Sequence, residues 1–71
     1  MPRMEEVFTC EGKILAGTAK AILFEIAGEE CWIPYSQLEG AEDYFEGETL
    51  RKGANVEVTM TAWIAKQKGL I

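Results

Sequence analysis

A period-two alternation on both sides of one glycine turn constrains the fold of this chain more than any other feature. Residues 21–34 read AILFEIAGEECWIP. Because successive side chains of a strand point to opposite faces, the apolar residues of this stretch share one face. These residues are Ile22, Phe24, Ile26, Cys31 and Ile33. A wholly apolar face has to be buried, so the stretch predicts an antiparallel hairpin that supplies the core.

Two tight turns compete for the register of this hairpin. A loop at Gly28-Glu29 places glycine first, as a type II′ turn requires, and pairs Glu25 with Trp32. The loop one residue earlier forces Ala27 to positive φ and sets Glu25 opposite Glu30. Positive φ is unfavourable for alanine, and like charges facing each other destabilise a strand pair. We therefore expect the Gly28-Glu29 loop. Pro34 lacks a ladder donor, so the second strand of the hairpin ends there or lies at an edge.

Strand patterns also occur on either side of this hairpin. Residues 5–16 have β character, interrupted by Glu11-Gly12, which predicts a tight turn or bulge, or alternatively a single bent strand. The first strand of the hairpin begins near Ala19. Residues 55–60, NVEVTM, alternate apolar and polar side chains and predict a half-buried strand.

A short helix is predicted over about 61–69. Thr61 is a good N-cap, and Gly69 lies where a left-handed C′ residue belongs. Leu70 then folds back onto the last turn, as in a Schellman motif. We expect Trp63 and Ile64 to pack this helix across one end of the sheet.

An acidic connection joins the hairpin to the later strand over about 36–53. Its spacing of apolar residues predicts one short helical turn. Its acids do not follow the order of a calcium-binding loop, so we interpret them as a solvated charged stretch. The candidate acidic patch contains Glu39, Glu42, Asp43, Glu46 and Glu48.

These elements fit one small domain over residues 1–71, since the chain is too short for two. The predicted class is mainly β: a small, partly closed SH3-like or OB-like barrel of three to five strands, with a short C-terminal helix. A barrel of this kind buries large side chains such as Phe24 and Trp63 in a short chain.

The residue inventory predicts no enzyme, no cofactor and no metal site. The sequence has no histidine, so the usual general base is absent and two thiolates cannot complete a zinc shell. Cys10 and Cys31 lack CxxC spacing and fit buried thiols in a reducing compartment. The N-terminus MPRMEEVF has no apolar signal segment, so we expect a cytoplasmic protein with no membrane association.

Charge and aromatic content favour a protein partner over a nucleic acid. Twelve acidic residues stand against seven basic ones, a net charge of −5, whereas phosphate binding requires clustered Lys and Arg. The expected hairpin register places Leu23, Trp32 and Tyr35 off the core face. An aromatic cluster with acidic neighbours resembles a protein-binding surface, and we take these three residues as its candidates.

Two stretches, KAILFEIAGEECWIPYSQ at 20–37 and AWIAKQKGLI at 62–71, give the chain a family resemblance. They cover about 28 of its 71 residues. Their pattern K-A-I-L, glycine turn, W-I-P-x-S-Q and W-I-A-x-x-K-G-L resembles small uncharacterised proteins encoded by phages and prophages. Ala27-Gly28, often Asp-Gly in such chains, and Tyr35 are the expected departures. The resemblance implies a phage accessory protein and carries over no catalytic residue.

The leading hypothesis is therefore a non-catalytic protein-binding module, in which the acidic patch imitates nucleic-acid phosphates and inhibits a host nucleic-acid-binding protein. Two alternatives stay open. One is an OB-like domain that binds single-stranded nucleic acid through its aromatic residues. The other is a structural protein that self-assembles through an edge strand, as a homo-oligomer.

Overall fold

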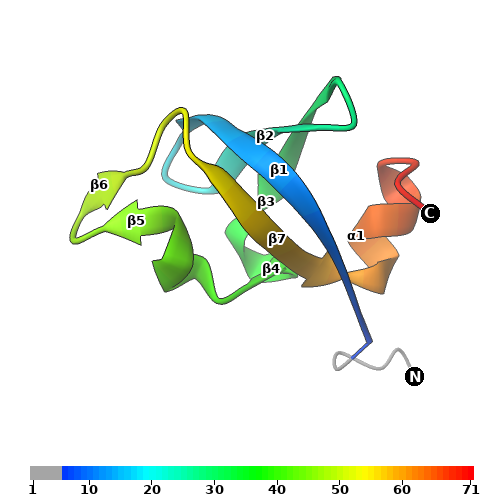
Figure 1. Cartoon of the computed structure of the whole chain (residues 1–71). Helices are drawn as coiled ribbons and strands as arrows, with labels where there is room; N and C mark the ends of the chain where they lie inside the picture. The colour runs from blue at the N-terminus through cyan, green and yellow to red at the C-terminus, as the bar shows by residue number, and fades with distance from the viewer. Residues whose placement is uncertain (1–5) are drawn as a thin grey trace.

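Strands dominate the computed structural model, which describes residues 6–71 (Figure 1). In chain order the elements are β1 (Val7–Gly17), β2 (Ala21–Ile26), β3 (Glu29–Pro34), the 3₁₀ helix η1 (Tyr35–Gln37), β4 (Leu38–Glu39), the 3₁₀ helix η2 (Ala41–Tyr44), β5 (Phe45–Glu46), β6 (Thr49–Leu50), β7 (Asn55–Thr61) and α1 (Ala62–Gln67). Five strands form one antiparallel sheet in the order β3-β2-β1-β7-β4, and β5 pairs with β6. The predicted mainly β class and C-terminal helix are confirmed. Within residues 6–71 the sheet ends at β3 and β4, and no closed barrel is found.

The long strand β1 lies at the centre of the sheet and pairs with both β2 and β7. It continues through Gly12 without a turn, so of the predicted alternatives the single strand is observed. A Cβ atom on Gly12 would lie 3.0 Å from Ile26 Cγ1 and 3.1 Å from Val58 Cγ2. Glycine is therefore favoured here by close packing and not by a turn. The β1–β2 register shifts between Ile14 and Ala16, which makes a bulge there.

The β2–β3 hairpin turns at Ala27 and Gly28, so the predicted Gly28-Glu29 loop is wrong. Both residues have positive φ, 55° and 81°. This conformation matches the right-handed twist of the flanking strands, as type I′ turns do. Glu25 consequently pairs with Glu30. Both carboxylates are exposed, so water screens their repulsion.

The side-chain faces predicted for this hairpin are nevertheless confirmed. The observed register pairs Phe24 with Cys31 instead of Ile33, a shift of two residues along β3. Because side chains alternate with a period of two, a two-residue shift leaves every side chain on its predicted face. All five apolar residues of the predicted face are buried, namely Ile22, Phe24, Ile26, Cys31 and Ile33.

The acidic segment after β3 folds across the inner face of the sheet and contributes to the core. It contains η1, β4, η2, β5 and β6, and it places Tyr44 in the core with 1% exposure. The Tyr44 ring meets Phe24 edge to face, with ring centroids 5.4 Å apart and an interplanar angle of 74°. The predicted helical turn corresponds to η2 (Ala41–Tyr44).

The predicted capping of the C-terminal helix is confirmed at both ends. Thr61 Oγ1 accepts a hydrogen bond from the Ile64 N–H at 3.3 Å. At the other end Gly69 has a φ of 74° and its N–H donates to the Lys66 carbonyl. The Leu70 N–H donates to the Ala65 carbonyl at 2.9 Å, which completes a Schellman motif.

Trp63 does not pack against the sheet, contrary to the prediction. Ile64 and Ala65 are buried, whereas Trp63 is 58% exposed. Neighbouring residues of a helix point about 100° apart, so a helix of six residues buries only one narrow stripe. Ile64 and Ala65, with Leu70 folded back beside them, fill that stripe. Within residues 6–71 no helix is long and apolar enough to span a membrane.

Candidate functional site

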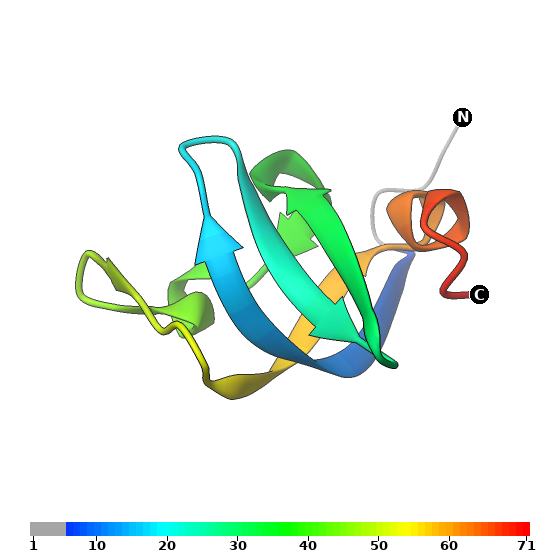
Figure 2. The ribbon, with the colours of Figure 1, turned by 90° about the horizontal axis from the view of Figure 1, so that it is seen from above.

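The outer face of the sheet carries a row of apolar side chains that ends at an edge strand. Ala16 on β1 pairs with Leu23 on β2, and Leu23 pairs with Trp32 on β3. Directly paired residues project to the same side of a sheet, so these three form a continuous strip, here called the apolar row. Ala16 and Leu23 are half-buried, but Trp32 is 43% exposed. Figure 2 shows β1, β2 and β3 side by side, with β3 outermost.

A charged row runs beside the apolar row. Lys13 on β1 pairs with Glu25 on β2, and Glu25 pairs with Glu30 on β3. All three side chains are exposed. The lysine lies next to one of the two carboxylates, whereas Glu30 lies at the outer end of the row. The sheet edge at β3 therefore presents an exposed tryptophan beside an exposed carboxylate.

Both rows depend on the observed register of the hairpin. In the register expected from the sequence, Trp32 would face Glu25 and the two glutamates would be separated. The observed register instead aligns Trp32 with Leu23 and Glu30 with Glu25. It does so although Ala27 has to adopt positive φ. The same register that strains the turn at Ala27 thus also aligns the apolar row and the charged row on the outer face.

The main chain of β3 has hydrogen-bonding groups on its open side. The Tyr35 N–H donates to the Lys20 carbonyl at 2.9 Å, and this bond shows which residues of β3 are hydrogen-bonded to β2. In an antiparallel pair the residues alternate between bonding the partner and facing away. The N–H and C=O groups of Glu30 and Trp32 therefore point away from β2. Pro34 has the same phase but contributes only its carbonyl.

Tyr35, the third candidate of the aromatic surface, lies apart from the apolar row. Its ring stacks on Phe45, with centroids 6.3 Å apart and planes 29° apart, and its hydroxyl donates to the Thr18 carbonyl at 3.2 Å. The side chain packs against the core cluster. The strand ends at Pro34, and η1 turns the chain away from the outer face. The structure thus brings Leu23 and Trp32 together and separates Tyr35 from them.

The acidic patch is spread over several short elements. Glu39 lies on β4, Glu42 and Asp43 on η2, Glu46 on β5, and Glu48 between β5 and β6. All five side chains are exposed. A cation lies among them, because Arg51 Nη1 donates to the Asp43 carbonyl at 2.8 Å.

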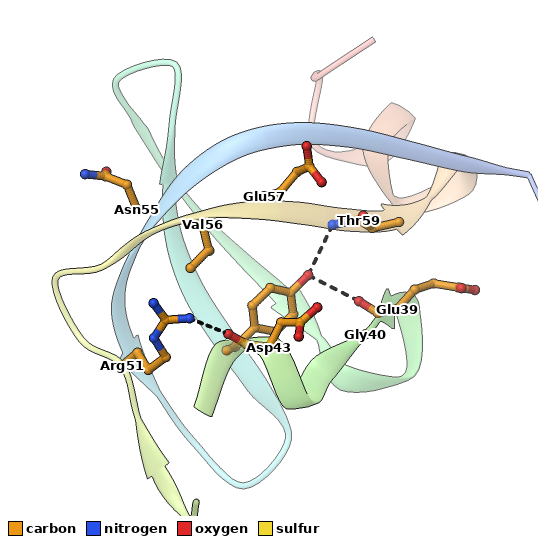
Figure 3. Close-up of a pocket in the computed structure, with 9 residues that line it drawn as sticks. Glu39, Gly40, Asp43, Arg51, Asn55, Val56, Glu57 and Thr59 are labelled. Atoms are coloured by element: carbon orange, nitrogen blue, oxygen red, sulfur yellow. Dashed lines mark hydrogen bonds between the residues drawn. The ribbon is translucent and has the colours of Figure 1, made fainter. Parts of the chain in front are cut away.

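Part of this patch borders a groove at the point where β4 separates from β7 (Figure 3). The groove has a volume of about 480 Å³ and is bordered by the acids Glu39, Asp43 and Glu57 and by Arg51. The Tyr44 hydroxyl lies at its base. It accepts a hydrogen bond from the Thr59 N–H at 3.1 Å and donates to the Glu39 carbonyl at 3.3 Å.

This hydroxyl links β4 and β7 at the end of their pairing, beside the paired residues Glu39 and Thr59. Burial raises the pKa of Tyr44 above its ordinary value, so the phenol stays protonated and structural. Sequence reasoning missed the groove, because it depends on Tyr44 reaching Thr59, which lies 15 positions away.

The two cysteines are free thiols on the inner face. Cys31 is buried and Cys10 is half-buried. Burial, followed by the nearby Cys31, raises the pKa of Cys10. Burial also raises the pKa of Cys31, which Lys68 lowers and Glu29 raises to smaller extents. A protonated thiol is a poor nucleophile, so burial does not activate either cysteine.

Comparisons with protein-family models, curated proteins and solved structures find no match to this chain. In the described part of the chain, no group of three or more His, Cys, Asp or Glu side chains is arranged to hold a metal ion. Function is therefore inferred from strand pairing, exposure and charge. On these grounds the apolar row at the β3 edge is the principal candidate site.

Proposed function

We propose that this protein is a small, acidic, non-catalytic protein-binding module whose contact surface is the apolar row at the β3 edge. The observation that carries the proposal is Trp32, 43% exposed at the outer end of that row. Tryptophan is enriched among residues that dominate protein–protein binding energy. Covering its exposed surface would add hydrophobic stabilisation that folding alone leaves unused.

The local costs of the β2–β3 hairpin support this proposal. Ala27 adopts positive φ and Glu25 faces Glu30, and each feature carries a local cost. Departures from local sequence preference in natural proteins concentrate at functional sites. Here the same register that carries these costs also assembles the apolar row.

The proposed setting is that of a cytoplasmic phage or prophage accessory protein that inhibits a host nucleic-acid-binding protein. The exposed acids Glu39, Glu42, Asp43, Glu46 and Glu48 would take the place of nucleic-acid phosphates on a basic partner. The net charge of −5 would also accelerate encounter with such a partner.

The finer fold that we propose is a partly closed SH3-like or OB-like barrel. The strand order, with β1 paired to both β2 and β7, and the bulge in β1 support a curled sheet. An OB-like barrel would also allow single-stranded nucleic acid to stack on Trp32. The charged neighbours Glu25 and Glu30 disfavour that reading, because they repel phosphates.

The two exposed tryptophans provide a matched test of the proposed function. Wild-type protein, Trp32→Ala and Trp63→Ala are immobilised and exposed to bacterial lysate, and the captured proteins are quantified by mass spectrometry. We expect a basic protein to be retained by wild type and Trp63→Ala but lost with Trp32→Ala. If Trp32→Ala captures the same proteins as wild type, this surface is not the binding site.

Charge reversal separately tests the proposal that the acidic patch imitates nucleic-acid phosphates. Glu42→Lys combined with Asp43→Lys and Glu46→Lys should weaken capture strongly at low salt and also abolish competition with a labelled oligonucleotide for the partner. Lys20→Glu is a control that alters charge on an exposed site outside the patch. Unchanged capture by the triple variant at low salt would rule out mimicry and leave the apolar row as the sole proposed contact.

A further inference from the structure

We infer that the partner contributes an extended strand that pairs with the free edge of β3, with an apolar side chain beside Trp32 and a Lys or Arg beside Glu30. This inference rests on the proposed protein-binding function and specifies the chemistry of its partner. Two observations support it: which main-chain groups of β3 are hydrogen-bonded to β2, and the order of charges across the sheet.

The main chain of β3 has N–H and C=O groups available to pair with another strand. Both the N–H and the C=O of Glu30 and of Trp32 point to the open side, as the Tyr35-to-Lys20 hydrogen bond requires. An added strand can therefore form rungs at these two residues without disturbing the bonds to β2. Strand addition at an open sheet edge is a recurring mode of peptide recognition.

The opposite end of the sheet is a poorer acceptor. There β4 contains only two residues, Leu38 and Glu39, and pairs with β7 only along those two. Of the two sheet ends described, β3 is thus the longer, with six residues.

The charged row predicts a cation on the added strand. Across the sheet it reads Lys13, Glu25, Glu30, and the next position lies on the open side of β3. Lys13 accompanies Glu25 on one side, but Glu30 has only the like charge of Glu25 as its neighbour in this row. A Lys or Arg beside Glu30 would offset that repulsion, because opposite charges on paired strands stabilise a sheet.

Negative charge at an edge also restricts which strands can pair there. Charged residues and proline are devices that prevent edge strands from pairing indiscriminately. Glu29, Glu30 and Pro34 supply both devices on β3. They discourage a second copy of this acidic chain while leaving a basic strand favoured.

Side-chain alternation predicts a sequence pattern for the added strand. Residues opposite Trp32 and Glu30 are two positions apart on the added strand, so their side chains share its outer side. The pattern is therefore an apolar residue and a Lys or Arg separated by one residue.

A displayed library of random linear peptides tests this pattern. Peptides are selected on the whole protein and counter-selected on Trp32→Ala. We expect enrichment of an apolar residue and a Lys or Arg separated by one position. Absence of enriched peptides, or enriched sequences without this spacing, overturns the inference.

Variants of Glu30 then separate main-chain pairing from charge. Glu30→Gln removes the carboxylate, whereas Glu30→Pro also removes the N–H that faces the open side and leaves the β2 ladder intact. We expect the best enriched peptide to bind Glu30→Pro about fivefold more weakly than Glu30→Gln, the effect of one lost hydrogen bond. Glu30→Lys should bind it more weakly than Glu30→Gln, with a smaller salt dependence than wild type.

Amide hydrogen exchange of the wild-type complex provides a second readout that does not depend on folding of the proline variant. Saturation with the enriched peptide should slow exchange at the Glu30 and Trp32 amides, while Cys31, already bonded to β2, changes little. Unchanged exchange at Glu30 and Trp32 overturns strand addition even if the peptide binds.

The outcomes distinguish this inference from the function on which it rests. If Trp32→Ala abolishes partner capture but Glu30→Pro and Glu30→Gln behave alike, the surface binds through side chains and only strand addition fails. If Trp32→Ala does not affect capture, the proposed function itself fails. A concentration-dependent dimer of the protein alone that Glu30→Pro dissolves identifies a second copy as the occupant and overturns the basic partner.

Discussion

At the residue scale, Tyr44 shows how one hydroxyl group organises a junction between strands. It is buried, and it joins the Thr59 N–H to the Glu39 carbonyl at the end of the β4–β7 pairing. Without it, two main-chain groups would lose their partner in a partly buried position. Tyr44 also lines the groove beside β7 (Figure 3).

Tyr44→Phe should therefore lower the free energy of unfolding by about 1–3 kcal/mol, the cost of leaving buried polar groups unsatisfied. Tyr35→Phe is the matched control, because the Tyr35 hydroxyl makes an exposed hydrogen bond to the Thr18 carbonyl. Urea unfolding of both variants measures the difference. Equal losses in the two variants would contradict the bridging role of Tyr44.

Ala27 is the residue at which the hairpin departs furthest from local preference. Its φ of 55° lies in the left-handed region, where asparagine is tolerated better than alanine. Asn-Gly is also the preferred pair for a type I′ turn. Ala27→Asn should raise the melting temperature and stabilise the protein by about 0.5–1 kcal/mol. Ala27→Val should destabilise it; stabilisation by both substitutions would exclude backbone strain as the cause.

At the element scale, α1 is stabilised mainly by hydrogen bonds at its two ends, because the helix itself is short. It has six residues, fewer than an isolated helix needs in water. Thr61 caps its first turn and also donates its hydroxyl hydrogen to Gln37 Oε1, which ties the helix to η1. The Schellman motif at Gly69 closes its last turn.

Thr61→Ala should destabilise the protein by more than the roughly 1 kcal/mol of an ordinary N-cap, because the bond to Gln37 is lost as well. Thr61→Ser keeps both hydrogen bonds and should retain most of the stability. Thermal unfolding followed by circular dichroism compares the two variants. A Thr61→Ser loss as large as that of Thr61→Ala would assign the effect to the missing methyl group instead.

At the scale of the whole molecule, the core keeps three titratable groups protonated. Burial raises the pKa of Cys10, Cys31 and Tyr44 above the values that they have in an unfolded chain. Such groups contribute stability that is fully present below their unfolded pKa values. This stability is lost as the pH rises through the folded values, because the unfolded chain releases the protons first.

Stability should consequently fall as the pH rises from about 8 to above 10, the range in which free thiols and phenols ionise. Urea unfolding at several pH values measures the slope. A variant with Cys10→Ala and Cys31→Ala is the control and should show a smaller decline between about pH 8 and 9.5. An unchanged slope in this variant would mean that the thiols do not contribute.

Much of the fold could be predicted because it depends on interactions between residues close together in the sequence. Alternation along β2 and β3 fixed which face is buried, and that result is insensitive to a two-residue change of register. Thr61 and Gly69 act within one helical turn, so their caps are readable from the chain. Leu23 and Trp32 could likewise be assigned to the outer face by alternation alone.

The remaining features were decided by tertiary structure, because each depends on residues distant in the chain. Twist of the whole hairpin selected the turn at Ala27, and packing of Ile64 and Ala65 left Trp63 exposed. Tyr44 meets Thr59 because the acidic segment folds across the sheet. The sequence by itself thus determined which side chains can form the core and where the helix begins and ends. The tertiary structure decided the register, and with it the alignment of Trp32 with Leu23 at an open edge, because strand pairing balances turn strain against the packing of the entire sheet.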